Sequence, residues 1–302
     1  MRFGVYLRAM RLPFLTGSMM PVTAAAACAY WESGTLDLSL LTLVVFGVAF
    51  LHLGGNLIND FYDSFGSDPI NRYATPFSGG SRVIQKQELS AETVLFMAYL
   101  FFGLAVLCGL ALIYLGRPYV IFLGLLGLGA AYLYSASPVQ LMSLGLGEVT
   151  IFLAFGPVLS FGAYYVMTGL LKPVGLAISL PLAFLITAIL WINEFPDLEA
   201  DETAAKRHLV VRLGLRRARW VYAGLMMAPF LSLFLLLEVF RMPELIFATL
   251  VALPLAAKAV GQAFETDPIA PEFVAIQALT IKTHFLTGLA LTLSLLYAAW
   301  RQ

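Results

Sequence analysis

The sequence predicts an all-α, polytopic membrane protein, a bundle of nine transmembrane helices with a polar cap on the cytoplasmic side. Hydrophobic residues make up 60% of the 302 positions and charged residues only 12%, and the mean hydropathy is +0.87. A soluble domain of this length needs more polar side chains on its surface, so the composition excludes that class. The apolar residues also recur in stretches of about 18 to 25, the length that spans a bilayer core.

Nine apolar stretches follow one another along the chain, so residues 1–302 are expected to form a single integral-membrane domain. The predicted spans cover residues 13–31, 38–59, 92–115, 118–136, 147–168, 173–194, 219–240, 243–263 and 278–300. The first stretch also resembles a secretory signal, because a basic start precedes an apolar run and the small residues of TAAAACAY. Eight further spans behind it favour an uncleaved first helix.

The basic residues predict the orientation of the bundle. If the N-terminus is cytoplasmic, the connections after spans two, four, six and eight lie on that side. Those regions and the N-terminal arm then hold fourteen of the eighteen Lys and Arg residues, and the opposite side holds Arg117, Lys172, Arg241 and Arg301. This asymmetry predicts a cytoplasmic N-terminus and an outside C-terminus in a cytoplasmic (inner) membrane.

Two acidic motifs stand at the start of the two long polar connections, 60–91 and 195–218. Acidic motif 1 (residues 59–68) opens with NDFYD, and acidic motif 2 (residues 193–201) opens with NEFPD. These connections follow spans two and six, so an even number of membrane crossings separates them. Both motifs are therefore predicted to emerge on the same face of the membrane.

Helical geometry groups the polar side chains that lead into acidic motif 1. Successive residues of a helix are rotated by about 100°, so residues three and four apart share a face. One polar stripe of the second span contains His52, Asn56, Asn59, Asp60 and Asp63.

The same geometry applies to acidic motif 2. Asn193, Asp197 and Asp201 recur every four residues and are predicted to share one face of the sixth span. Glu199 points elsewhere and is expected to be solvated. Two clusters of carboxylate and amide oxygens facing one cavity suit Mg²⁺, which binds a few carboxylates together with water and substrate phosphates. The alternative is that these carboxylates only solvate helix ends at the membrane surface.

Groups that can bind an anion lie beside both motifs. The segment PFSGGSRVI (76–84) combines flexible backbone N–H groups with Ser81 and Arg82, and DETAAKRHLVVRLG (201–214) adds Lys206 and Arg207. Glycines let backbone donors approach an anion, and arginine can contact phosphate oxygens with two N–H groups. Together with two metal-suited clusters, these groups predict a diphosphate site.

With these motifs the chain resembles the UbiA superfamily of intramembrane prenyltransferases over nearly its whole length. The resemblance rests on nine spans, an NDxxD element after the second and a DxxxD element after the sixth. PFSGGSRVI, NEFPDLEADETAAKRHLVVRLG and YLYSASPVQLMSLGLGEV (132–149) look most like the menaquinone branch, the 1,4-dihydroxy-2-naphthoate prenyltransferases.

The resemblance implies roles for individual residues. Asn59, Asp60 and Asp63 would hold one Mg²⁺, and Asp197 and Asp201, assisted by Asn193, would hold a second. The four aspartates would be the catalytic residues. The diphosphate would be bound by the ions together with Ser81, Arg82, Lys206 and Arg207.

The implied reaction transfers a polyprenyl group from its diphosphate to an aromatic, naphthoate-like acceptor. Ionisation of the allylic C–O bond would be followed by attack of an electron-rich ring carbon and loss of the ring carboxylate. Membrane lipids are the expected surroundings, and neither a nucleic acid nor an obligate protein partner is expected. The alternatives are a related enzyme that prenylates 4-hydroxybenzoate or a lipid alcohol, and a transporter. A transporter is disfavoured because the acidic residues lie at span ends rather than at span midpoints.

Several polar residues are left without an assigned role. Asp68 lies five residues after Asp63, where many family members have a spacing of four. Glu148 could be a carboxylate at a helix N-terminus, and His52 could be a hydrogen-bonded histidine of the bundle. Four aromatic residues could form a wall that stabilises a cation or could simply pack: Tyr132, Tyr134, Tyr164 and Tyr165.

Overall fold

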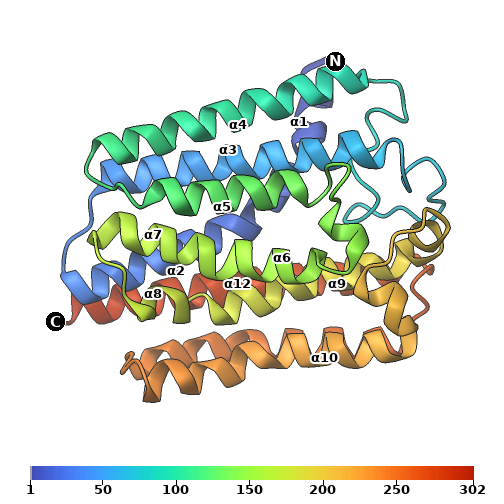
Figure 1. The fold of residues 1–302 in the computed structure, drawn as a ribbon. Helices are drawn as coiled ribbons and strands as arrows, with labels where there is room; N and C mark the ends of the chain where they lie inside the picture. Colours follow the sequence, from blue (N-terminus) through green and yellow to red (C-terminus); the bar gives the residue numbers. More distant parts are fainter. Residues whose placement is uncertain (1) are drawn as a thin grey trace.

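In the computed structural model, which describes residues 2–302, each of the nine predicted apolar stretches forms a helix or a run of consecutive helices (Figure 1). Within that range, eight helical segments are long and apolar enough to cross a membrane. Their component helices are α1 (Arg2–Met10), η1 (Leu12–Leu15), α2 (Thr16–Ser33), α3 (Leu38–Asp63), α4 (Ala91–Tyr114), α6 (Gly147–Leu153), η3 (Ala154–Val158), α7 (Leu159–Thr168), α8 (Pro173–Ala177), α9 (Leu180–Thr203), α10 (Leu209–Glu238), η4 (Glu244–Ala252), α11 (Leu253–Glu265) and α12 (Phe273–Trp300). The predicted all-α membrane fold is confirmed.

Two elements differ in length from the prediction. The stretch 118–136 forms the short helix α5 (Val120–Leu133), whose 14 residues extend about 21 Å. Helix α9 continues to Thr203 and α10 begins at Leu209, so the prediction of a long polar connection over 195–218 is wrong. Good helix formers such as Leu198 and Ala200 carry α9 through acidic motif 2, which therefore lies on a helix.

Burial within the bundle separates central helices from peripheral ones. In the most apolar stretch of the segment formed by α8 and α9, 72% of the residues are buried, whereas in that of α4 only 17% are buried. The small residues 24–29 of α2 are all buried, and they allow close packing against α7 and α12. Large apolar side chains on the periphery are exposed, among them Phe96, Leu107, Leu110, Phe122 and Leu125.

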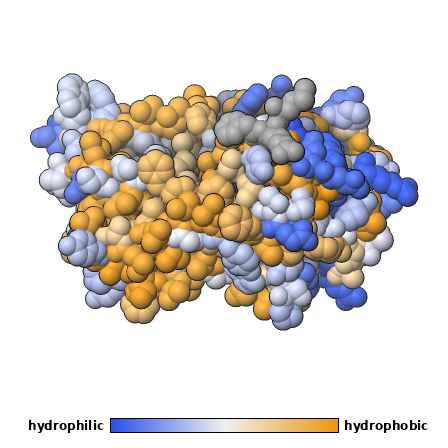
Figure 2. Space-filling model, turned by 90° about the horizontal axis from the view of Figure 1, so that it is seen from above, coloured by the Kyte–Doolittle hydropathy of each residue, from blue (hydrophilic) through white to orange (hydrophobic). Residues whose placement is uncertain are grey.

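The exposed apolar side chains form a broad zone between two hydrophilic ends (Figure 2). Such a surface is unfavourable in water and suits the hydrocarbon core of a bilayer. Together with the eight long apolar helices, it is the surface of an integral membrane protein.

Three loops gather at one end of the bundle, on the right in Figure 1. They are the α3–α4 loop (64–90), the α5–α6 loop (134–146), which contains η2 (Leu141–Leu144), and the α9–α10 loop (204–208). Helix α1 lies near the same end, since Arg8 Nη2 is 2.5 Å from Glu88 Oε2, whereas the C-terminus lies at the opposite end. We call the three loops and the helix ends that they cover the polar cap.

Candidate functional site

Acidic motif 1 lies where α3 enters the polar cap. Asn59 donates from Nδ2 to Asp63 Oδ2 at 2.8 Å, one helical turn further along. Asp60 is only 3% exposed and accepts a hydrogen bond from the backbone N–H of Ser81 at 3.2 Å. The guanidinium of Arg11 approaches the same carboxylate, with Nη1 3.6 Å from Asp60 Oδ1. These polar side chains therefore face protein groups and not lipid.

Acidic motif 2 is held by the two loops that flank it. Asp197 accepts hydrogen bonds from Asn71 Nδ2 at 2.8 Å and from Ser78 Oγ at 3.0 Å, both in the α3–α4 loop. The carboxylate of Asp201 is buried, and its Oδ2 lies 3.2 Å from His208 Nε2. Residues far apart in the sequence thus meet in the polar cap, beside the end of α9.

Lys206 joins the two motifs directly. Its Nζ lies 2.9 Å from Asp63 Oδ1 and 3.4 Å from Asp201 Oδ1, and its side chain is only 12% exposed. Burial alone would lower the pKa of Lys206, but the nearby Asp63 and Asp201 carboxylates overcome that effect and hold the pKa above its ordinary value. Lys206 is therefore a fixed positive charge between the two acidic motifs.

The α3–α4 loop is shaped around a further buried carboxylate. Arg82 Nη1 donates to the backbone oxygen of Asp68 at 2.8 Å, and Gln85 Nε2 donates to Asp68 Oδ2 at 3.0 Å. Gly80 has a φ of +70°, and a Cβ atom there would lie 2.8 Å from Asp68 Oδ2 and 3.1 Å from Asp60 Oδ1. Glycine is required at this position because of both its backbone conformation and this close approach.

Asp68 lies close enough to acidic motif 1 to share its electrostatic environment. Burial, followed by repulsion from Asp63 and Asp60, raises the pKa of Asp68 to about 7. A carboxyl group with such a pKa is partly protonated at neutral pH when no cation is bound nearby. Asp60, Asp63 and Asp68 therefore lie close enough together to repel one another.

The remaining residues predicted to bind the anion or the metals lie further from the ion pairs of Lys206. Asn193 accepts a hydrogen bond from Gln277 Nε2 at 3.0 Å and lines the cavity described below. Arg207 is exposed, and within residues 2–302 no ion pair joins it to either motif. Glu199 is exposed, as the helical face argument predicts.

An apolar cavity of about 460 Å³ opens from the polar cap into the bundle. Its polar end is lined by Arg11, Asn56, Asn59 and Asn193. Residues of α3 from Leu43 to Asn59 line it, which corresponds to about 24 Å along the helix axis. The cavity can therefore hold a long apolar chain whose polar group lies at the acidic motifs.

Histidine and tyrosine side chains near this cavity have distinct surroundings. His52 lines the cavity, forms a hydrogen bond between its Nδ1 and Ser18 Oγ, and packs edge-on against Phe155. Of the four tyrosines considered from the sequence, only Tyr134 is among the lining residues. Tyr164 forms a hydrogen bond with Glu32, away from the acidic motifs.

Sequence reasoning missed several residues that shape the site. Asn71 and Ser78 lie in an irregular loop, where no periodicity indicates the direction of a side chain. Arg11 approaches Asp60 from the turn between α1 and η1, and only the tertiary fold reveals this. Glu194 and His208 lie within the quoted motifs, but helical spacing does not predict that their side chains lie close together.

Comparison with known proteins agrees with this arrangement. The family described as "UbiA prenyltransferase family" matches residues 18–275 of this chain. The chain is 31% identical to "UbiA prenyltransferase domain-containing protein 1" of Dictyostelium discoideum over 73% of this chain and 67% of that protein. It is 30% identical to "1,4-dihydroxy-2-naphthoate octaprenyltransferase" of Mycobacterium tuberculosis, with 86% of each protein covered.

Solved structures share the fold. A UbiA homologue from Archaeoglobus fulgidus bound to DMAPP and Mg²⁺ has a TM-score of 0.62 and 20% identity, and the match covers 93% of this chain and 98% of that one. The apo structure of a UbiA homologue from Aeropyrum pernix K1 has a TM-score of 0.69 and 12% identity, covering 93% and 97%. With the family match across most of its length, this chain belongs to the UbiA prenyltransferase family and is an integral membrane prenyltransferase.

Proposed function

We propose that this protein transfers a polyprenyl group from its diphosphate to 1,4-dihydroxy-2-naphthoate in menaquinone biosynthesis, in a reaction that requires Mg²⁺. The observation that carries the proposal is the position of Lys206 between Asp63 and Asp201. It brings the two acidic motifs together at the polar end of an apolar cavity. A substrate with an anionic head and a long hydrocarbon tail fits both parts.

The residues present fit a pair of divalent cations. Among the described residues, Lys206 and Arg11 are the two Lys or Arg side chains that form ion pairs with the carboxylates of Asp60, Asp63, Asp197 and Asp201. Such an excess of buried negative charge is costly without further cations. Oxygen donors of this kind suit Mg²⁺, and the Archaeoglobus fulgidus homologue is described as bound to Mg²⁺ and DMAPP.

In this proposal Asn59, Asp60 and Asp63 hold one ion, and Asp197 and Asp201, assisted by Asn193, hold the second. When bound, the ions supply positive charge that neutralises the diphosphate. Lys206, Ser81 and Arg82 contribute donors at its edge, and Arg207 contributes charge at the exposed rim.

The apolar cavity contributes to the chemistry by keeping water from the reacting carbon. As the allylic C–O bond breaks, the electron pair leaves with the diphosphate, and Lys206 stabilises this developing charge. The ring carbon of the acceptor that bears the carboxylate then forms the new C–C bond to the allylic carbon. Loss of the ring carboxylate as CO₂ restores the aromatic ring.

The acceptor and the metal requirement are tested together. Purified protein is incubated with a prenyl diphosphate and, separately, with 1,4-dihydroxy-2-naphthoate, 4-hydroxybenzoate or a lipid alcohol, and the products are identified by mass spectrometry. We expect the decarboxylated naphthoate product, its loss in excess EDTA, and its recovery with Mg²⁺. A product formed only from another acceptor would change the assignment, and full activity in EDTA would reject the mechanism.

We also propose that the polar cap faces the cytoplasm, with the C-terminus on the opposite side of an inner membrane. The excess of Lys and Arg at the N-terminal arm and cap loops supports this orientation. Single cysteines at positions 75 and 205, in a background without Cys28 and Cys108, should react with an impermeant reagent only from the cytoplasmic side. Labelling of the two positions from opposite sides would contradict the shared cap.

The cavity predicts that a bulky residue in its wall restricts the prenyl chain. Gly162 lines the cavity, and a Cβ atom there would meet only Leu123, at 3.7 Å. Gly162→Phe should therefore lower kcat/KM for long polyprenyl diphosphates by about 10-fold or more relative to geranyl diphosphate. Gly103→Phe, at an exposed position of α4 outside the cavity, is the control and should leave this ratio unchanged. An equal ratio in both variants would exclude the cavity as the prenyl site.

A further inference from the structure

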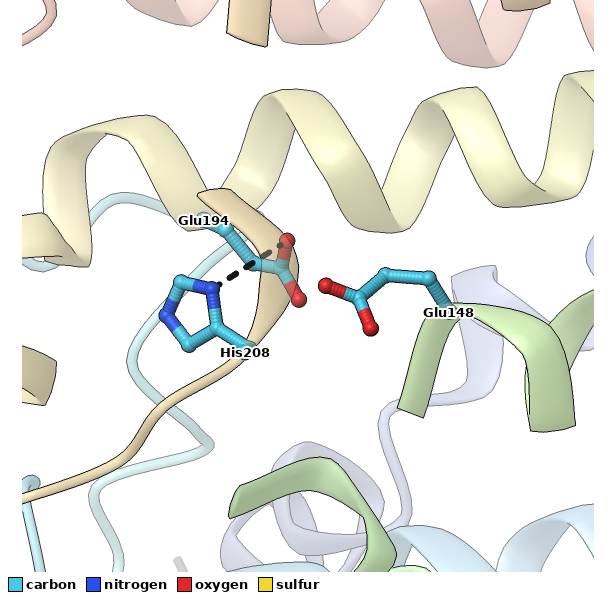
Figure 3. Close-up of side chains that lie close together, drawn as sticks. All are labelled: Glu148, Glu194 and His208. Atoms are coloured by element: carbon cyan, nitrogen blue, oxygen red, sulfur yellow. Dashed lines mark ion pairs between the residues drawn. The ribbon is translucent and has the colours of Figure 1, made fainter. Parts of the chain in front are cut away.

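Beside acidic motif 2, three further side chains meet in the interior of the polar cap. Glu148 comes from the start of α6, Glu194 from α9, and His208 from the segment just before α10 (Figure 3). One ligand atom from each lies within 4.8 Å of the other two. Glu148 is 2% exposed and His208 3% exposed, and the Glu194 side chain is 12% exposed. We call these three residues the Glu–Glu–His cluster.

Two carboxylate oxygens of the cluster are buried without a hydrogen-bond donor. Glu148 Oε1 accepts from the backbone N–H of Leu209 at 2.6 Å, but Glu148 Oε2 has no partner, nor does Glu194 Oε2. The Glu148 carboxylate is directed towards that of Glu194 (Figure 3). Two buried carboxylates that face each other repel, and leaving their oxygens unpaired carries a large desolvation cost. A positive charge between them would remove both penalties.

The histidine can bring a third lone pair to the same space, because the hydrogen bond that its Nδ1 accepts is long and would be given up to a bound ion. Its Nε2 lies 3.2 Å from Asp201 Oδ2, an acceptor, so this nitrogen carries the proton. Its Nδ1 accepts a long hydrogen bond from the backbone N–H of Val211 at 3.4 Å, and it lies 3.7 Å from Glu194 Oε2. A carboxylate that holds the outer N–H of an imidazole is the arrangement that orients metal-binding histidines.

We propose that Glu148, Glu194 and His208 bind one divalent transition-metal ion of the Zn²⁺ class, separate from the two Mg²⁺ ions of the acidic motifs. An imidazole nitrogen with two carboxylates favours such an ion over Mg²⁺, which prefers an all-oxygen shell. Zinc–ligand distances are about 2.0–2.2 Å, so small side-chain rotations would bring the three atoms around one ion, with water completing the shell.

The proposed ion would join α6, α9 and the start of α10. It would also fix the imidazole of His208 against Asp201, which the proposed function places at a Mg²⁺ ion. The zinc site itself does not depend on the prenyl-transfer proposal, because none of its three ligands is assigned to the Mg²⁺ ions or the diphosphate.

Metal retention tests this inference. The full-length protein is stripped with EDTA, loaded with Zn²⁺ in excess Mg²⁺, desalted, and analysed for zinc by mass spectrometry. We expect about one zinc per chain in the unaltered protein. Glu148→Gln and Glu194→Gln keep the shape of the side chain and should weaken Zn²⁺ binding by more than the roughly 10- to 100-fold typical of changes outside the ligand shell.

Two controls separate this site from its surroundings. Glu199→Gln changes an exposed carboxylate on the same helix as Glu194 and should retain its zinc. The double variant Asp63→Asn/Asp197→Asn should also retain zinc even when prenyl transfer is lost. Zinc that disappears in this double variant but persists in the Glu148 and Glu194 variants would overturn the assignment. An unaltered protein that holds no more zinc than Glu194→Gln would do the same.

A spectroscopic measurement on the unaltered protein covers the case in which a glutamate variant does not fold. Co²⁺ loaded in place of Zn²⁺ should give a visible absorption band that Zn²⁺ abolishes and excess Mg²⁺ leaves in place. A band that Mg²⁺ abolishes, or the absence of a band, would contradict a site with a histidine ligand.

Discussion

Asp63→Asn and Asp197→Asn should each lower the rate of prenyl transfer by at least about 100-fold, equivalent to about 2.7 kcal/mol of transition-state stabilisation. Asparagine has nearly the same size as aspartate but lacks the negative charge that would hold a divalent cation. Asp63 pairs with Lys206, and Asp197 accepts hydrogen bonds from Asn71 and Ser78. The measurement is the initial rate at saturating Mg²⁺, with helical content and gel-filtration profile as checks of folding.

Glu199→Gln provides the matched control for this result. It removes a carboxylate from the same helix at an exposed position, so its rate should stay close to that of the unaltered protein. Near-normal rates for both Asp variants would show that these carboxylates only solvate helix ends. A large loss of rate in the Glu199 variant alone would show that the functional face of α9 has been assigned wrongly.

Lys206→Met should strongly destabilise the protein in Mg²⁺-free buffer. The substitution leaves the carboxylates of Asp63 and Asp201 buried without their shared cation. Breaking a buried pair in this way costs about 3–5 kcal/mol, and the lower end applies here because the site retains some contact with solvent. For a chain of this size the apparent Tm in detergent should fall by on the order of 5 °C or more.

Mg²⁺ should reduce that deficit, because cations bound by the acidic motifs supply the missing positive charge. Arg207→Met is the matched control: it removes the adjacent positive charge at an exposed position, so its effect on stability should be within about 0.5 kcal/mol. If both variants melt at the same temperature without Mg²⁺, Lys206 is not the internal counter-ion of the site.

The elements that could be predicted from the sequence are those with a regular physical signal. Hydropathy located the helices because each must match the thickness of a bilayer. It did not locate their ends, since α9 continues beyond the apolar residues to Thr203 and α5 has only 14 residues. Helical periodicity placed Asn59 and Asp63 on one face, and their hydrogen bond agrees with this.

The contacts that could not be predicted depend on irregular backbone. Lys206 was expected at a phosphate, and nothing in the sequence indicated that it would also pair with the carboxylates of Asp63 and Asp201. Asn71 and Ser78 reach Asp197 from a loop whose course depends on Gly80 and on the buried Asp68. Local sequence patterns do not reveal contacts between residues so far apart in the chain.

The hydrogen bonds from the α3–α4 loop to Asp197 also have a consequence for biosynthesis. Asn71 and Ser78 leave the ribosome more than 100 residues before the carboxylate that they bind. Until α9 has been inserted, this loop lacks the partner that holds it in place, and acidic motif 1 has no opposing wall. The earlier helices must therefore enter the membrane without the finished site, and a nascent chain that ends before α9 contains only two of the four proposed catalytic aspartates. The enzyme becomes competent only late in its own synthesis, when α9 and the following loop reach the growing cap.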